Sequence, residues 1–126
     1  MQNEDLNTDV TTAMFGAPCA IYTRAQALAD GVLHDVTRIA NEVGLPAQSA
    51  FTRSVMEWIG GADDPEFAGT AYQVLWMTLG ALWRHVRARR FSFGMLRDGY
   101  TMTFTVDLSD GDDGEPVLTI GFPQDF

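Results

Sequence analysis

Two histidines and one cysteine are the side chains in this sequence best suited to nucleophilic or acid–base chemistry. His34 directly precedes Asp35, and a thiol at Cys19 could use His34 as its base. A small hydrolase or transferase built on these three residues is therefore one hypothesis. Alternatively, Cys19 is a small packed residue, and His34 and Asp35 lie in a surface turn. All eight basic residues are arginine, and without lysine neither Schiff-base nor P-loop chemistry is available. We therefore expect a protein that is not an enzyme.

Metal and cofactor sites are not expected either. Residues 110–115 are rich in Asp and Gly, as in a calcium-binding loop. The required spacing fails, however, because Gly114 and Gly121 occupy positions where an EF-hand has an acidic or amide ligand and a glutamate. The single cysteine and the two distant histidines give no zinc spacing. The segment is more typical of a hairpin turn.

Negative charge dominates the composition and points to a basic partner. Seventeen Asp and Glu residues oppose eight arginines, for a net charge of −9. Such a chain is repelled by nucleic acid and by anionic membranes, so a protein with a basic surface is the favoured partner. Two acidic groups are the candidate partner-binding residues: Asp63, Asp64 and Glu66 in a central loop, and Asp110, Asp112, Asp113 and Glu115 in the C-terminal hairpin. They could imitate a phosphate backbone, or they could simply form a solvated surface that aids solubility.

Five of the eight arginines lie within residues 70–97, a segment that contains no acidic residue. Two interpretations fit this cluster. Arginines near the end of a helix stabilise the helix dipole. Alternatively, they form a basic patch that binds an acidic partner, for which the guanidinium group is well shaped. The members are Arg84, Arg87, Arg89, Arg90 and Arg97.

The elements that must position these residues begin with short helices. A chain of 126 residues fits one domain, which we place at residues 13–126 after a flexible acidic tail at residues 1–12. Cap residues and glycine stops delimit three short helices. The helices are expected at residues 24–29 after the N-cap Thr23, after a second N-cap at Thr37 and through Val43 before Gly44, and at residues 52–59 before Gly60. Residues 32–36 could form a strand or an ordered loop.

One long helix is expected at residues 70–89. Its first half is apolar nearly all round, which is typical of a buried central helix. Trp76 and Trp83 are seven residues apart and therefore share nearly one face. They could pack in the core, or they could anchor a partner or a second copy. A structural or regulatory homodimer that pairs through Trp83 or through a strand at residues 91–95 is thus a further hypothesis.

The C-terminal third has the two-residue period of strands. Apolar residues alternate over residues 91–95, 102–108 and 118–122, and Asp98-Gly99 is a hairpin signal. These runs predict a three- to four-stranded antiparallel sheet with one apolar face, which the long helix would cover. The predicted fold class is α+β.

A reducing compartment, the cytoplasm, is expected from what the sequence lacks. The N-terminal residues have no basic and apolar regions of the kind found in signal peptides. No apolar run approaches the roughly 20 residues of a membrane-spanning helix. One cysteine cannot form an internal disulfide.

Three segments resemble a family of small proteins carried by phages, plasmids and other mobile elements. They are residues 22–36 (YTRAQALADGVLHDV), 74–77 (VLWM) and 111–120 (GDDGEPVLTI), with His34 in place of an apolar residue. The resemblance implies a mobile-element origin, and small acidic proteins of that setting include anti-CRISPR and anti-restriction inhibitors. The expected function is therefore a non-enzymatic inhibitor of a bacterial defence system. It would bind a basic nucleic-acid-binding surface of the effector complex.

Overall fold

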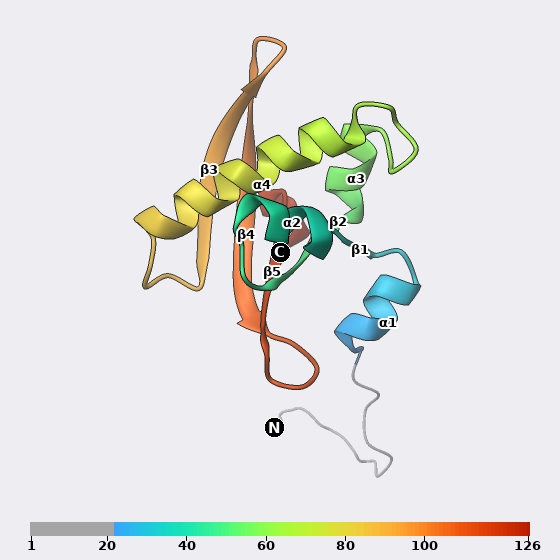
Figure 1. Cartoon of the computed structure of the whole chain (residues 1–126), viewed down its shortest axis with the longest axis vertical. Helices are drawn as coiled ribbons and strands as arrows, with labels where there is room; N and C mark the ends of the chain where they lie inside the picture. The colour runs from blue at the N-terminus through green and yellow to red at the C-terminus, as the bar shows by residue number, and fades with distance from the viewer. Residues whose placement is uncertain (1–21) are drawn as a thin grey trace.

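The computed structural model describes residues 22–126, in which four helices pack on a five-stranded sheet (Figure 1). The predicted tail at residues 1–12 and Cys19 lie outside the described residues. The elements are, in chain order, α1 (Arg24–Ala29), β1 (Leu33–Asp35), α2 (Thr37–Val43), β2 (Gln48–Thr52), α3 (Arg53–Ile59), α4 (Phe67–Arg84), β3 (Arg90–Arg97), β4 (Tyr100–Asp110), β5 (Pro116–Gly121) and a short 3-10 helix, η2 (Pro123–Asp125).

The sheet has the strand order β1-β2-β5-β4-β3, with β2 and β5 parallel and the other neighbours antiparallel. The α+β class and the antiparallel run β3-β4-β5 are confirmed. The prediction of a three- to four-stranded, purely antiparallel sheet is wrong, because β1 and β2 extend the sheet and β2 pairs in parallel. Strand β2 escaped the pattern analysis because Ser49 and Ala50 are both buried, so the polar–apolar alternation of an exposed strand is absent.

Local capping chemistry explains where the short helices begin and end. The hydroxyls of Thr23 and Thr52 accept hydrogen bonds from the backbone of the first turns of α1 and α3. Gly44 and Gly60 end α2 and α3 in the left-handed region, at φ 115° and 111°. Thr23, Gly44 and Gly60 are confirmed predictions. Thr52, expected as the first residue of its helix, is the N-cap of α3, and Thr37, expected as an N-cap, is the first residue of α2.

Helix α4 lies across one face of the sheet, as expected, but it is not buried all round (Figure 1). Val74 and Leu75 are fully buried, whereas Trp76 and Trp83 are 56% and 73% exposed. The prediction of a buried central helix is therefore wrong. A two-layer fold covers a helix on one side only, so the apolar residues on the other side of α4 remain exposed. The helix also ends at Arg84, five residues before the predicted end.

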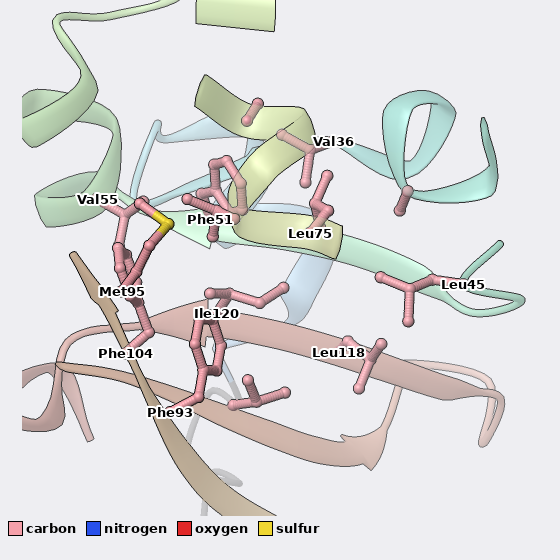
Figure 2. Close-up of a cluster of buried hydrophobic side chains, with 14 of the residues drawn as sticks. Val36, Leu45, Phe51, Val55, Leu75, Phe93, Met95, Phe104, Leu118 and Ile120 are labelled. Carbon is pink, nitrogen blue, oxygen red and sulfur yellow. The ribbon is translucent and has the colours of Figure 1, made fainter. Parts of the chain in front are cut away.

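The core lies between α4 and the sheet. Phe51, Ile120, Val106 and Phe91 stand in register across β2, β5, β4 and β3, and each is buried. Figure 2 shows Leu75 of α4 in the same cluster as Phe51 and Ile120. Within the described part of the chain, no helix combines the length and the apolar character needed to cross a membrane.

The residues after β5 close the opposite face of the sheet near Gly121. The carboxylate of Asp125 accepts hydrogen bonds from the hydroxyls of Thr52 and Ser54, at 2.8 and 2.9 Å. A Cβ at Gly121 would meet side-chain atoms of Thr52, Asp125 and Phe126 at 2.7 to 2.9 Å. Only glycine therefore allows η2 to approach the sheet this closely.

Candidate interaction surfaces

The two predicted acidic groups lie at different ends of the molecule. Residues 110–115 form the β4–β5 loop at the bottom of Figure 1, and residues 63–66 lie in the α3–α4 loop at the upper right. The structure therefore does not join them into one continuous acidic face. Each group has to be considered as a separate surface.

In the α3–α4 loop, one acidic side chain shapes the turn and two remain at the surface. Asp64 accepts a hydrogen bond from the backbone N–H of Glu66 through Oδ1, at 2.8 Å. Asp63 and Glu66 are exposed next to the start of α4.

In the β4–β5 loop, two of the four predicted residues hold the local structure. Asp112 accepts hydrogen bonds from the backbone N–H groups of Arg24 and Ala25, at 2.9 and 3.0 Å, and so fixes the start of α1. Glu115 accepts from the backbone N–H of Asp113, at 2.9 Å. Asp113 is exposed, and Asp110 forms an exposed ion pair with Arg89 at 3.6 Å.

Arg24 lies near carboxylates from two separate stretches of the chain, residue 35 and residues 107–115. Its guanidinium is half-buried and donates to Thr119 Oγ1 at 2.7 Å and to the carbonyl of Leu118 at 2.9 Å. Burial lowers the pKa of Arg24, while the nearby carboxylates of Asp35, Asp112, Glu115 and Asp107 oppose that shift. Arg24 therefore lies near several carboxylates, one of which, that of Asp107, also pairs with Arg90.

Strand register explains why these carboxylates converge. Asp35, Ala50, Thr119, Asp107 and Arg90 form one row across all five strands, on the face away from α4. Arg24 reaches this row at its centre, at Thr119. We call the surface around Arg24 the acidic end; its carboxylates are Asp35, Asp107, Asp110, Asp112, Asp113 and Glu115. Sequence reasoning missed Asp35 as a member of this surface and missed Arg24 and Asp107, because only the register of β1 and β4 brings them together.

His34 and Asp35 do not form an acid–base pair in this structure. Successive residues of a strand face opposite sides of the sheet. His34 lines an open groove of about 590 Å³ together with Arg53 and Glu57. Asp35 instead accepts a hydrogen bond from the backbone N–H of Thr37, at 3.0 Å. The third residue of that hypothesis, Cys19, lies outside the described residues.

The remaining ionisable groups do not assemble a metal site either. Among residues 22–126, no three side chains of His, Cys, Asp or Glu are grouped so that they could hold a metal ion. The second histidine, His85, stacks on Phe91 with 5.5 Å between the ring centroids.

The arginine cluster is divided in space. Arg89 and Arg90 pair with carboxylates of β4, at 3.6 and 3.2 Å. Arg97 lies at the other end of β3, where its guanidinium is 4.7 Å from the ring centroid of Trp58. Arg84 occupies the last turn of α4, where a cation complements the helix dipole, and Arg87 follows closely.

A row of apolar side chains follows the outer side of α4 and continues past its end. We call it the α4 stripe; it consists of the exposed Tyr72, Trp76 and Trp83, the half-buried Leu79, and the exposed Val86, which lies two residues beyond the helix. The spacing of four and three residues places Tyr72, Trp76, Leu79 and Trp83 on one side of the helix. Beside Trp83, a depression of about 300 Å³ is lined by Gly44, Pro46 and Leu82 as well as by stripe residues. Of the two interpretations of Trp76 and Trp83, core packing is therefore wrong.

Comparison of the chain with protein families, with curated proteins and with solved structures finds no match. Its function therefore has to be argued from the sequence and from the surfaces described above.

Proposed function

We propose that this protein is a non-enzymatic inhibitor of a bacterial defence complex and that it binds a basic, nucleic-acid-binding surface of that complex through the acidic end. The observation that carries the proposal is the convergence of four carboxylates, those of Asp35, Asp107, Asp112 and Glu115, near Arg24, with Asp110 and Asp113 on the same loop. Five of the six lie within residues 107–115, and the pairing of β1 into the sheet adds Asp35.

The surface keeps an excess of negative charge after its own arginines are counted. Six carboxylates face Arg24, Arg89 and Arg90, so the net charge is about −3, and since B-DNA carries one negative charge per about 1.7 Å of its axis, this matches about 5 Å of duplex. A basic channel that binds nucleic acid would attract such a surface over several ångströms. Opposite charge mainly raises the rate of association and sets specificity. The net charge of −9 adds to this long-range attraction.

The acidic end is held in shape before any partner arrives. The carboxylate of Asp112 accepts hydrogen bonds from the backbone of α1, and that of Glu115 accepts one from the loop backbone. Asp110 and Asp113 are the exposed members that would contact the partner directly. A fixed loop loses little conformational entropy on binding, which favours affinity. Asp63, Asp64 and Glu66 are left out of this interface, because they lie at the other end of the molecule.

The resemblance to mobile-element proteins supplies the biological setting. Proteins of such elements meet the defence systems of a bacterial host, and those systems handle nucleic acid with basic surfaces. Among these systems we favour a CRISPR–Cas effector over a restriction enzyme as the target. This choice rests on the resemblance and on the charge.

Charge reversal at the acidic end tests the proposal. The double variant Asp110→Lys/Asp113→Lys changes side chains that do not shape the loop. The double variant Glu42→Lys/Glu57→Lys changes two exposed residues of α2 and α3 and alters the net charge equally. Capture from a lysate of a bacterium with an active CRISPR–Cas system, at low salt, with mass spectrometry identifies the partner.

We expect the acidic-end variant to bind the captured complex roughly tenfold more weakly, with a smaller dependence on salt. We also expect it to lose the ability to protect a targeted phage in a plaque assay. The Glu42/Glu57 variant should retain both properties. Equal binding by the wild type and the acidic-end variant, over a full salt titration, would contradict the proposal.

A further inference from the structure

The α4 stripe is a second surface that the acidic end does not explain. Trp83, Val86 and Trp76 are 73%, 69% and 56% exposed, and Tyr72 is 45% exposed. Tryptophan and tyrosine are the residues most enriched at binding hot spots. Tyr72, Trp76 and Trp83 follow one side of α4 for about three turns and form an apolar patch of the size that often marks an interaction site.

We infer that this face binds a second copy of the chain, with the two α4 helices packed antiparallel across a two-fold axis. A two-fold axis between Trp76 and Leu79 places each Tyr72 against the partner's Trp83. It also places each Trp76 against the partner's Leu79. The row of side chains on each helix would thus pack against the same row of the other. The inference does not depend on the proposed function.

Charge complementarity selects a second copy as the occupant. Asp63 and Glu66 precede the N-terminal end of α4, and Arg84 and Arg87 lie at its C-terminal end. In an antiparallel pair, the acidic residues before the start of each α4 helix therefore lie near the arginines at the C-terminal end of the other. The two-fold axis produces this contact twice. The opposed helix dipoles also attract each other in this arrangement. A surface that is complementary to itself is the requirement for a two-fold interface.

The area of the stripe is consistent with a stable pair. Taking about 200 Å² for each whole aromatic side chain, the exposed parts of Tyr72, Trp76 and Trp83 amount to about 350 Å² per copy. Two copies would bury about 700 Å² of aromatic surface, against the roughly 1,000 Å² that a specific interface needs. Val86 and the charged ends supply the remainder. The depression beside Trp83 gives a site for an aromatic ring of the partner.

The other available route to a homodimer is weaker on charge grounds. Strand β3 is an edge of the sheet and could pair with its own copy. In an antiparallel pair centred between Phe93 and Gly94, however, Arg90 of each copy stands opposite the partner's Arg97. Like charges that face each other across a ladder are destabilising. The α4 stripe therefore offers the better self-complementary surface.

Sedimentation equilibrium of the full chain in the micromolar range tests the inference. We expect the wild type to form dimers and Trp83→Glu to raise the dimer Kd by at least about thirtyfold, since Trp83 would be a hot spot. Leu96→Glu is the matched control, because Leu96 is 68% exposed but lies on β3. It should leave the dimer Kd unchanged.

A charge swap separates pairing from folding defects. Glu66→Arg and Arg87→Glu should each weaken the dimer, and the double variant should restore it, because this axis brings Arg87 opposite residue 68 of the second copy, next to Glu66. A wild type that remains monomeric would overturn the inference. The stripe would then have a different occupant, either residues 1–21 or another protein. A dimer that is lost with Leu96→Glu and kept with Trp83→Glu would overturn it in favour of β3.

Discussion

Neighbouring acidic residues in the β4–β5 loop have different physical roles. Asp112 accepts two backbone hydrogen bonds from α1, whereas the side chain of Asp113 is exposed at the surface. The sequence presents the two as equivalent members of one acidic run. A local pattern cannot separate them, because the partners of Asp112 are 87 and 88 positions away. Residue types and caps were predictable at this scale, and long-range partners were not.

Tyr22 provides a pH-dependent prediction at the same scale. Its hydroxyl donates to Asp30 at 2.8 Å, and this hydrogen bond raises the pKa of Tyr22 above its usual value of 10.0. The folded state therefore holds the Tyr22 proton more tightly than the unfolded state does. The stabilisation of the fold by this hydrogen bond is present below about pH 10 and is lost as the pH rises through the pKa that Tyr22 has in the folded state.

An NMR titration of the tyrosine ring signals checks this expectation, with Tyr22→Phe to assign the resonance. Asp30→Ala should bring the pKa of Tyr22 back toward its ordinary value. An identical titration curve in wild type and Asp30→Ala would show that the hydrogen bond does not hold the proton.

At the scale of elements, α1 is too short to be stable alone and depends on its contacts. Helices shorter than about 12 residues are marginal in water, and α1 has six. Asp112 holds its start, Arg24 ties it to β5, and Arg53 donates to the carbonyls of Asp30 and Gly31 beyond its end. Because Arg24 is central to the acidic end, the position of α1 also sets the shape of that surface.

Removal of the Asp112 carboxylate should therefore release α1. We expect Asp112→Ala to lower the free energy of unfolding by about 1 kcal/mol, as for the loss of a helix cap. Amide hydrogen exchange over residues 24–29 should accelerate at the same time. Asp113→Ala is the control, since it removes an equal charge from the next position. Equal exchange rates in the two variants would rule out this role for Asp112.

The elements that the sequence predicted correctly are those with local signals. Thr23, Thr52, Gly44 and Gly60 delimit short helices through contacts within a few residues, and Asp98-Gly99 makes the predicted turn with both residues at positive φ. Strand β2 was not predicted, and residues 32–36, which contain β1, were left open between a strand and a loop. These two short strands form by pairing with other segments of the chain, and five residues or fewer are too short to show a clear periodic pattern.

At the scale of the whole molecule, the apolar cluster around Phe104 links the sheet to α3 and to the C-terminal segment. Phe104 is fully buried, and its ring lies 5.4 Å from Phe93, 5.5 Å from Trp58 and 5.3 Å from Phe122, between centroids. These contacts join β3, α3 and the residue after β5. The cluster therefore couples the helical half of the chain to the strands.

Truncation of Phe104 should affect the stability of the entire fold. We expect Phe104→Ala to reduce the free energy of unfolding by about 3–5 kcal/mol, out of the roughly 5–15 kcal/mol typical of a domain. Urea unfolding followed by tryptophan fluorescence measures the loss. Thr103→Ala, at the exposed neighbouring position, should change stability by less than about 0.5 kcal/mol. A similarly small effect at Phe104 would mean that the cluster is not central to stability.

The overall architecture was predictable only in outline. Helices followed by strands indicated α+β, and the alternation of Phe91, Phe93 and Met95 indicated a sheet under a helix. The strand order was not predictable, and so neither was the separation of the two acidic groups. Which charges share a surface depends on that order, and Asp35 belongs to the acidic end only because it occupies the same row of the sheet as Asp107.

The placement of β5 between β2 and β4 has a consequence for biosynthesis. A ribosome delivers β1, β2, β3 and β4 before β5, yet the first two strands and the next two touch only through it. Until residues 116–121 are in place, β1-β2 and β3-β4 can form only as two separate ladders, each with one unpaired edge that β5 later fills. Pairing that depends on such distant segments slows folding and leaves these strand edges open to misassociation.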